Sequence, residues 1–364
     1  MPWPLTSQSK SAEIMSDMKH YQVAAGIHAG RVNEASALAS LLQAAGVNGK
    51  RFIIKVNWFG PEYGYFTDAR TLDLVLSSLP PSEKIVVEGH AYGRNDGSRE
   101  INWRDLNEAF DKWEWILQQE AWFLESTGLA EVLKKHGTKY INVTDEVWAG
   151  RAVSAETVAA AVEVCYSPVA DPEMYTFIPE KLWDLRGTTL ISLARIKVRS
   201  PNALAEDASP YSPIYSLSMK NLFGLVPDPF RFRWHGTKGQ RLAQSILDNA
   251  KIYSALFDVV GFNEGIFHTL LNDPIGEHET NWGRYDIADD QGVAVLGRNL
   301  IQLDTFTAAL FFPLDWQRWP LFEMAVADFG PVEKQLLDTS PPDFADIADD
   351  CLQRYGAPAA ALAS

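Results

Sequence analysis

The chain has 364 residues, of which 46% are hydrophobic and 22% are charged, and its formal net charge at pH 7 is −15. This length and apolar content are sufficient for a sizeable core, in one large α/β unit or in two domains. The acidic charge argues against nucleic acid and against an anionic membrane surface as partners, because both attract basic proteins.

Sequence motifs narrow the functional classes further. No apolar run approaches the roughly 18 residues of a membrane-spanning helix, and the N-terminus lacks the pattern of a signal peptide. Cys165 and Cys351 are far apart in sequence and could pair, but because the chain is acidic and shows no export signal we expect a cytoplasmic protein with reduced thiols. Two cysteines are too few for a four-cysteine iron–sulfur cluster, and no nucleotide-binding glycine motif or GxSxG elbow is present. The sequence therefore identifies no cofactor.

The first half of the chain alternates between strand and helix patterns. Residues 1–19 show no period and are predicted as a loose leader. Strands are predicted at residues 20–27, 52–56, 84–89 and 140–144, and helices at 32–45, 69–79 and from Asp105 onward. This order is typical of an α/β fold with mostly parallel or mixed sheets flanked by helices. We take residues 20–166 as an N-terminal α/β lobe, in which 152–166 fit either a helix or a strand.

The second half follows a connector at residues 167–187, which has several prolines and no steady period. Strands are predicted at residues 188–198, 256–260 and 292–296, and helices at 239–253, 300–311 and 316–329. A loop at 200–215 is a candidate mobile cover. We therefore predict a C-terminal α/β lobe at 188–337, a central cleft between the two lobes, and a mobile tail at 338–364.

Polar residues follow several of these strands. Ligands of open α/β sheets bind beyond the carboxyl ends of the parallel strands. Lys55, Asn57 and Glu88 lie at such ends in the first half of the chain. Lys197 and Arg199 lie near the end of the strongest predicted strand of the second half. All five are candidates for substrate binding, and the alternative for each is a solvated loop residue.

Residues 216–235 form a second candidate region. They place five polar residues among apolar and aromatic ones, namely Lys220, Asn221, Arg231, Arg233 and His235. A glycine and two prolines prevent one long helix or strand. One interpretation is a turn that rests on the core and keeps its charges in water. The other is a pocket wall where lysine and arginine meet an anion and where His235 titrates near neutral pH.

The run at residues 219–227, followed by His235, resembles the signature of the uncharacterised domain of unknown function 362 family. The resemblance extends from about residue 50 to about residue 330. It implies an α/β fold and leaves the reaction open. Many members of this family carry an attached iron–sulfur module, which we do not expect here because the chain has two cysteines.

Other segments resemble further elements of the same family. Residues 54–57 are similar to its Ile-Lys-Pro-Asn element, with valine in place of proline, and 196–199 to its Lys-x-His element, with Arg199 in place of histidine. Glu264 falls in a segment that resembles the family's Gly-x-x-Glu-Gly turn. Asp304 falls in a segment where the family has an aspartate between small residues.

Together these features predict an enzyme that acts on a small anionic, carboxylate-bearing metabolite. Lys55, Lys197 and Lys220 would hold the anion, because several lysines at strand ends create a local positive potential in an acidic protein. Asn57 and Asn221 would orient the anion.

His235 and Glu264 are the candidate proton-transfer pair. Lys220 and Asp304 complete the catalytic candidates, and Glu88 is a further supporting group. Isomerisation, elimination or cyclisation is the expected class, so that the enzyme would be a lyase, isomerase or cyclase, because the sequence has no redox or phosphate cofactor signature.

Two alternatives remain open. The same residues would serve a non-catalytic protein that binds a metabolite or docks a redox partner, or they would only brace the two lobes. We assign no metal ligand, and a divalent metal at Glu277, His278 and Glu279 stays an open alternative, since adjacent residues in a loop are weak metal signals. The sequence also leaves a homo-oligomer open.

Overall fold

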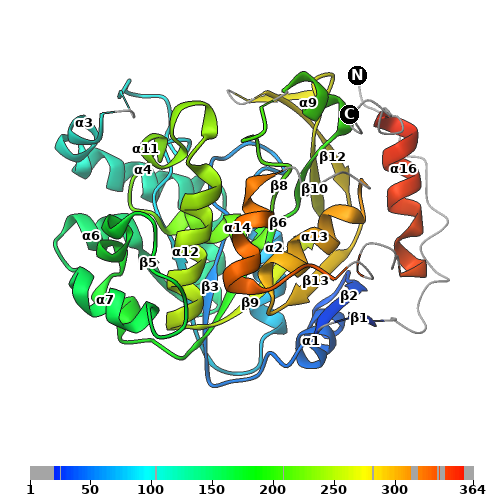
Figure 1. Ribbon diagram of the computed structural model, residues 1–364, viewed down its shortest axis with the longest axis horizontal. Coiled ribbons are helices and arrows are strands. Elements are labelled where there is room, and N and C mark those ends of the chain that lie inside the picture. The colour runs from blue at the N-terminus through cyan, green and yellow to red at the C-terminus, as the bar shows by residue number, and fades with distance from the viewer. Residues whose placement is uncertain are drawn as a thin grey trace.

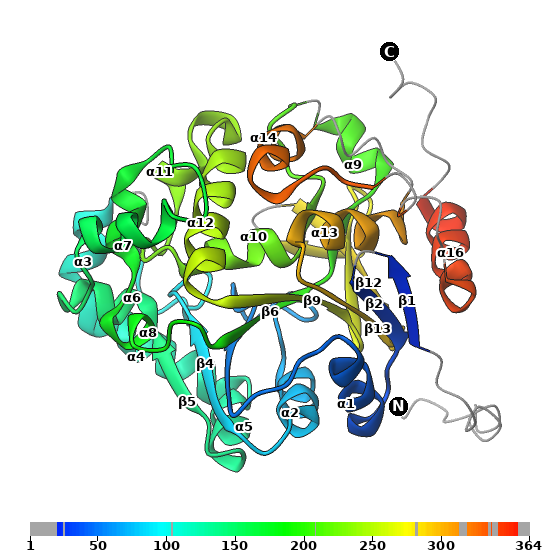
Figure 2. The same cartoon turned by 60° about the horizontal axis from the view of Figure 1, so that its bottom comes forward.

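The computed structural model describes residues 20–24, 26–102, 105–207, 209–280, 283–312, 319–333, 336 and 341–355. The expected leader at 1–19 lies outside these residues. Helices cover both faces of a large mixed sheet, and a smaller sheet lies beside it (Figures 1 and 2). The predicted α/β class with mixed sheets flanked by helices is therefore confirmed. The predicted two lobes and their connector at 167–187 stay a prediction.

The large sheet has eight strands in the order β1-β2-β13-β9-β6-β3-β4-β5. Its strands are β1 (His20–Ala24), β2 (Ile27–Arg31), β3 (Arg51–Lys55), β4 (Glu83–Glu88), β5 (Lys139–Asn142), β6 (Thr189–Arg195), β9 (Asp258–Gly265) and β13 (Val293–Gly297). The five strands from β9 to β5 run parallel, and β13, β2 and β1 add antiparallel pairs at one edge. The parallel part therefore has all its carboxyl ends on one side.

The smaller sheet has five strands in the order β11-β12-β10-β7-β8. Its strands are β7 (Lys197–Arg199), β8 (Tyr215–Ser216), β10 (His268–Asn272), β11 (His278–Thr280) and β12 (Gly283–Asp289). Ile196 joins the two sheets, because its N–H donates to the carbonyl of Glu264 in β9 and its carbonyl accepts from Leu270 in β10. The strand predicted at 188–198 is therefore two strands, β6 and β7, in two sheets.

Helices pack on the two faces of the large sheet (Figure 2). On one face lie α1 (Ala35–Ala44), α2 (Ala69–Ser78) and α5 (Leu129–Lys135). On the other lie α10 (Ser218–Leu222), α12 (Leu242–Leu256), α13 (Leu300–Ala309) and α14 (Pro320–Phe329). The remaining helices are α3 (Leu106–Asp111), α4 (Trp113–Ser126), α6 (Val143–Trp148), α7 (Ala155–Val162), α8 (Glu180–Trp183), α9 (Pro201–Glu206), α11 (Phe232–His235) and α16 (Ala345–Tyr355).

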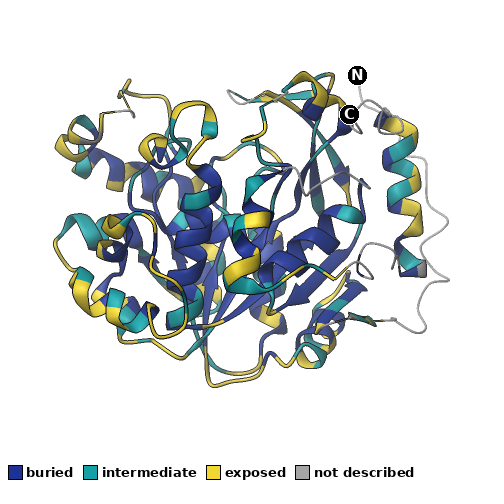
Figure 3. Cartoon of the chain, in the orientation of Figure 1, coloured by how far each residue is buried: buried dark blue, intermediate teal, exposed yellow. Residues whose placement is uncertain are grey.

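The sheet separates two apolar cores. Phe52 and Ile54 of β3 pack into one core and Ile53 into the other, as the alternation of side chains along a strand requires. All three side chains are fully buried, and Figure 3 shows burial concentrated in the sheet and in the inner faces of the helices. A strand buried on both faces reads as a continuous apolar run in the sequence, which is why β3 was predictable.

Several predicted elements differ from the structure. The single strand predicted at 20–27 is a hairpin, because the chain turns at Gly26 with φ of 75° and Ala24 pairs with Ile27. Residues 152–166, which fit a helix or a strand, contain helix α7. Part of the segment predicted as a tail forms α16, whose Ile347 and Cys351 are buried.

Among the helices that the structure describes, none has both the length and the apolar character needed to cross a bilayer.

Candidate functional site

A cavity of about 610 Å³ lies beyond the carboxyl ends of β3 and β4, between the large sheet, the smaller sheet and helix α10. Eight of the residues predicted from the sequence line it: Lys55, Asn57, Glu88, Lys197, Arg199, Lys220, Asn221 and His235. Part of the predicted cover at 200–215 also lines it, through residues of α9 and of the loop that follows. The structure therefore brings the strand ends and the 216–235 stretch to one cavity.

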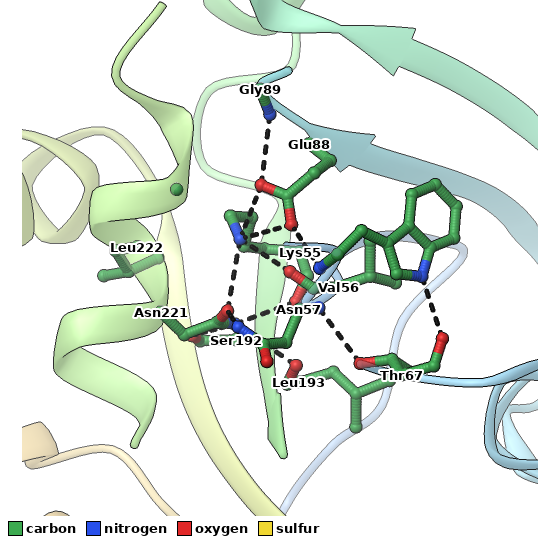
Figure 4. A network of polar contacts seen from close by, with 12 residues as sticks. Lys55, Val56, Asn57, Thr67, Glu88, Gly89, Ser192, Leu193, Asn221 and Leu222 are labelled. Carbon is green, nitrogen blue, oxygen red and sulfur yellow. Dashed lines mark hydrogen bonds and ion pairs between the residues drawn. The ribbon is translucent and has the colours of Figure 1, made fainter. Parts of the chain in front are cut away.

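Lys55 is held in a buried ion pair. Its Nζ lies 2.9 Å from Oε1 of Glu88, and the two side chains are 0% and 3% exposed (Figure 4). The same nitrogen donates to the carbonyl of Val56 and to Oδ1 of Asn221. Burial lowers the pKa of Lys55 to about 8, and the charge of Glu88 opposes this shift. Lys55 is thus already neutralised by a protein carboxylate.

Asn221 connects three elements around this ion pair (Figure 4). Its Nδ2 lies 3.1 Å from the carbonyl of Lys55 in β3 and 3.2 Å from the carbonyl of Leu193 in β6. Its Oδ1 accepts from Nδ2 of Asn57 at 3.2 Å. These bonds hold α10 over the ends of the strands. Asn221 thus positions the cavity wall by binding the backbone carbonyls of β3 and β6.

The 219–227 run contains a glycine because the backbone at position 224 lies against the Lys55–Glu88 ion pair. A Cβ atom at this position would lie 2.6 Å from Nζ of Lys55 and 2.7 Å from Oε1 of Glu88, so any side chain here would have to displace the ion pair. The carbonyl of Gly224 also accepts from the N–H of Gly89, directly after β4. The missing side chain therefore lets this backbone cover the ion pair.

Lys197 is a buried lysine of a different kind. Its Nζ lies 4.0 Å from the ring centroid of Tyr65. Among the described residues, no hydrogen bond or ion pair to this nitrogen is present. Burial, followed by the positive charges of Lys220 and Arg195, lowers the pKa of Lys197 well below its usual value. The amine is therefore readily deprotonated.

Lys220 and Arg199 supply positive charge next to Lys197. Nζ of Lys220 donates to Oγ of Ser216 at 2.9 Å, and burial, followed by the charge of Arg199, lowers the pKa of Lys220 to about 8. Arg199 lies 3.1 Å from Asp207, just after α9. Arg199 is thus partly neutralised, whereas no carboxylate pairs with Lys220 among the residues that the structure describes.

His235 ends the short helix α11. Its ring lies 5.6 Å from that of Phe223, measured between centroids. Burial, followed by the charges of Lys220 and Arg231, lowers the pKa of His235 to about 3. The imidazole is therefore uncharged at neutral pH and, in the ligand-free cavity, is a weak base. The expectation that His235 titrates near neutral pH is corrected, because a cationic and partly dry surrounding disfavours the imidazolium.

Glu264 does not line the cavity that contains His235. Its Oε1 lies 2.6 Å from Nε of Arg195, and both side chains are completely buried. Arg195 also contacts Asp68 at 3.0 Å. Burial raises the pKa of Glu264 to about 7, although the charge of Arg195 opposes this shift. Glu264 thus belongs to a buried ion cluster between β6 and β9.

Asp304 also lies outside the cavity lining. Its two oxygens accept from the backbone N–H groups of Ser218 and Met219, at 3.0 and 2.8 Å, and Oδ1 accepts from Asn263. These groups are the first N–H donors of α10, for which Leu217 offers no side-chain cap. Burial raises the pKa of Asp304 to about 7. The geometry gives Asp304 a role in holding α10.

Arg195 was not singled out in the sequence, whereas Arg231 was noted among the basic residues of the 216–235 stretch that could meet an anion. Arg195 ends β6, and its signal was the same as that of Lys55, a cation inside an apolar run. Arg231 lines the cavity and donates to the carbonyl of Gly224 at 2.7 Å, from a left-handed backbone with φ of 59°. No local pattern in the sequence predicts that conformation.

The segment considered for a divalent metal is Glu277, His278 and Glu279. His278 and Glu279 lie on β11, where the ring of His278 stacks on Tyr285. Within the described part of the chain, no three His, Cys, Asp or Glu side chains gather in an arrangement that could hold a metal ion.

Comparison with known families gives one match. Residues 212–309 match the family described as Domain of unknown function (DUF362), so the resemblance of the 219–227 run is confirmed. The matched range includes Lys220, Asn221, His235, Glu264 and Asp304. The proposed family elements at 54–57 and 196–199 lie outside it and stay predictions. No curated protein and no solved structure matches the chain.

Proposed function

We propose that the cavity binds a small anionic metabolite that carries a carboxylate, and that the protein is an enzyme acting on it by acid–base chemistry. One observation supports this proposal above all. Half-buried Lys220 lines the cavity beside buried Lys197, and no carboxylate pairs with either amine among the described residues. A protein with a net charge of −15 has many carboxylates to offer, so this local excess of cations favours an external anion.

The electrostatic gain from such an anion is large enough to drive binding. A carboxylate about 4 Å from one ammonium group gains about 4 kcal/mol at an effective dielectric constant of about 20. The anion would also raise the lowered pKa of Lys220, because a nearby negative charge favours the charged amine. Binding and protonation of this lysine are therefore coupled.

In this proposal Lys55 supports the cavity wall, whereas the sequence predicted that it would bind the anion. Glu88 already neutralises it, and its Nζ also donates to Val56 and Asn221. We therefore assign the ligand's carboxylate to Lys220, and to Lys55 and Asn221 the task of holding the cavity wall in place.

Proton transfer in the cavity would use Lys220 and His235, which both line it. Lys220, with a pKa of about 8, donates a proton near neutral pH. The bound anion would raise the low pKa of His235, because a nearby negative charge favours the imidazolium, and the imidazole would then accept a proton. A positioned acid or base of this kind contributes about 10²–10⁴-fold to a rate. Isomerisation, elimination and cyclisation all require such transfers, and they remain our proposed reaction classes.

The rest of the wall suggests the ligand's size and character. Aromatic side chains make up much of the lining, namely Trp58, Phe59, Tyr65, Tyr92, Tyr215, Phe223 and Phe230. Such walls bind an apolar or aromatic body while the lysines bind the carboxylate. The cavity volume of about 610 Å³ is typical of a site for a metabolite rather than for a macromolecule.

Thermal unfolding with paired ligands tests the proposal. Each carboxylic acid is compared with its own neutral amide at pH 7. We expect carboxylates to raise the melting temperature and amides to leave it unchanged, with about 2.7 kcal/mol of stabilisation at a concentration 100 times Kd. The effect should decrease as the pH rises through 8, because Lys220 loses its charge there.

Two variants make the test specific. Lys220→Ala should lose the carboxylate effect, and Lys134→Ala should keep it, because Lys134 is exposed at the end of α5. Equal stabilisation by the amide, or an unchanged response of Lys220→Ala, would rule out the anion site. Recovery of a bound carboxylate without any product would leave a metabolite-binding protein in place of an enzyme.

A further inference from the structure

We propose that Lys197 forms an imine with a carbonyl carbon of the ligand, which makes the substrate an oxo acid. The inference rests on the proposed function, because the anion site must first hold the carboxylate. It adds covalent chemistry and a defined substrate class to that site.

Strand register places the two lysines next to each other. Lys197 of β7 lies directly opposite Ser216 of β8 in an antiparallel pair. Residues that face each other in this way project from the same side of a sheet, with Cβ atoms about 4.5–5.5 Å apart. Because Oγ of Ser216 accepts from Nζ of Lys220 at 2.9 Å, the ammonium of Lys220 lies beside the side chain of Lys197.

The surroundings of Lys197 favour an uncharged amine. The residue is 6% exposed, and its Nζ rests over the ring of Tyr65. Burial and the charges of Lys220 and Arg195 lower its pKa well below the usual value. A lysine that is desolvated and adjacent to another cation is an activated nucleophile towards carbonyl groups.

Other buried lysines in the described part of the chain lack these features. Nζ of Lys55 lies 2.9 Å from Glu88 and donates hydrogen bonds to two further groups. Nζ of Lys251 lies 3.6 Å from Asp328, donates to Oγ of Ser167, and does not line the cavity. A hydrogen-bonded ammonium has no free electron pair, so Lys197 is the candidate nucleophile.

The imine step balances without any additional reagent. Nζ of uncharged Lys197 attacks the carbonyl carbon, a C–N bond forms, and the π electrons of the C=O bond move to oxygen. One proton passes from nitrogen to that oxygen, which gives a carbinolamine. The hydroxyl takes a second proton from solvent and leaves as water, and the product is a protonated C=N bond. Water reverses these steps to release the product.

The protonated imine connects this step to the proposed acid–base chemistry. It accepts the electron pair of an adjacent C–H bond, and the proton goes to the imidazole of His235, whose low pKa the bound carboxylate would raise. Lys220 meanwhile holds the carboxylate. Because the two lysines are neighbours, the carboxylate and the carbonyl group must be close together in the ligand, which indicates a 2-oxo or 3-oxo acid.

Reductive trapping tests the inference with phenylpyruvate as the probe, because it joins a 2-oxo acid to an aromatic body. After incubation at pH 7, sodium borohydride reduces any imine to a stable secondary amine. We expect intact-mass analysis to show one added ligand, less one oxygen atom, and peptide mapping to place it on Lys197. Phenyllactate, which has a hydroxyl in place of the carbonyl, should bind in the thermal assay and give no adduct.

Variants and a ligand-free measurement complete the test. Lys197→Met should abolish the adduct, and Lys134→Met should not change it. Without any ligand, trinitrobenzenesulfonate at pH 7 should modify Lys197 at least about tenfold faster than an exposed lysine, since an ordinary lysine with a pKa near 10.4 is only about 0.04% uncharged.

The outcomes separate the two proposals. Stabilisation by both phenylpyruvate and phenyllactate without an adduct on Lys197 would overturn the imine and leave the anion site standing. Stabilisation by no carboxylate would overturn the anion site, and the imine with it. Slow modification of Lys197 by trinitrobenzenesulfonate would overturn the uncharged nucleophile whatever ligand binds.

Discussion

Lys55 and Lys197 are buried lysines of one cavity, yet only Lys55 has a carboxylate partner among the described residues. An ion pair that is fully buried contributes little net stability, but the loss of one partner leaves a charge without compensation. The Lys55–Glu88 pair therefore holds the cavity wall, while the unpaired Lys197 remains available to a ligand.

The first prediction at this scale concerns Glu88. Glu88→Gln should lower the free energy of unfolding by about 3–5 kcal/mol, because it leaves the Lys55 ammonium buried without its counter-charge. Glu83→Gln is the matched control at the other end of β4, where the partners Arg51 and Lys139 are exposed. Its effect should stay below about 1 kcal/mol. Urea unfolding measures both, and equal effects would contradict the prediction.

Single residues also show what sequence reasoning could and could not predict at the site. Lys55 and Lys197 were predictable, because a cation within an apolar run seldom belongs to a core without a reason. The pairing of Glu264 with Arg195 was not, because it depends on the register of β6 against β9. Nothing near Glu264 in the sequence indicates that partner.

Helix α10 is the element that determines the site. It is five residues long, and it carries Lys220 and Asn221. A helix this short has little intrinsic stability, so its position depends on Asn221 at the strand ends and on Asp304 at its first N–H groups. The 219–227 run was recognisable in the sequence, but the contact with Asp304 spans 85 residues of sequence and was not.

The prediction for this element is a pH dependence. Burial raises the pKa of Asp304 to about 7, from about 3.9 in an unfolded chain, so the folded state binds the proton more tightly. The contribution of this group to stability is therefore present below about pH 4 and is lost as the pH rises towards 7. Asp304→Asn cannot titrate, and its amide cannot accept both N–H groups.

We expect Asp304→Asn to be less stable than wild type by about 1–3 kcal/mol at pH 5, and the difference to decrease as the pH approaches 7. Urea unfolding between pH 4.5 and about 7.5 would measure it. A difference that grows with pH would mean that the charged carboxylate is the favoured partner of α10.

The sequence predicts where a strand ends only if the run of apolar residues ends at the same place. Residues 188–198 read as one strand, because the apolar run continues through Ile196, where the chain passes from one sheet to the other. The pattern of side chains is the same in both sheets, so it contains no signal for the change. The α/β order was visible in the sequence because β3 and β4 are short apolar runs separated by a helix.

At the scale of the whole molecule, the cavity lowers the free energy of unfolding. Burial of the Lys197 amine disfavours its charged form, so folding has to work against the protonation of this lysine at pH 7. Functional sites commonly reduce stability in this way, and substitutions that remove the unfavourable group often stabilise a protein.

Lys197→Met should therefore raise the free energy of unfolding by about 0.5–2 kcal/mol at pH 7 while it removes the proposed imine. The folded-state pKa of Lys197 lies below its unfolded value, so the folded state binds fewer protons and wild-type stability rises with pH up to about 10. The advantage of the variant should accordingly decrease between pH 7 and about 10. Thermal and urea unfolding would show this, and a destabilised variant would contradict it.

The strand order of the large sheet also affects how the chain is made. The first hairpin, β1 and β2, pairs with β13, and Arg31 of β2 contacts Asp346 of α16. During synthesis, β9 is complete before β13 exists, so its outer edge has no partner until the last strand of the sheet leaves the ribosome. An unpaired apolar edge invites association between chains. In the nascent protein, the outer edge of β9 therefore stays open to association with other chains until β13 has been translated.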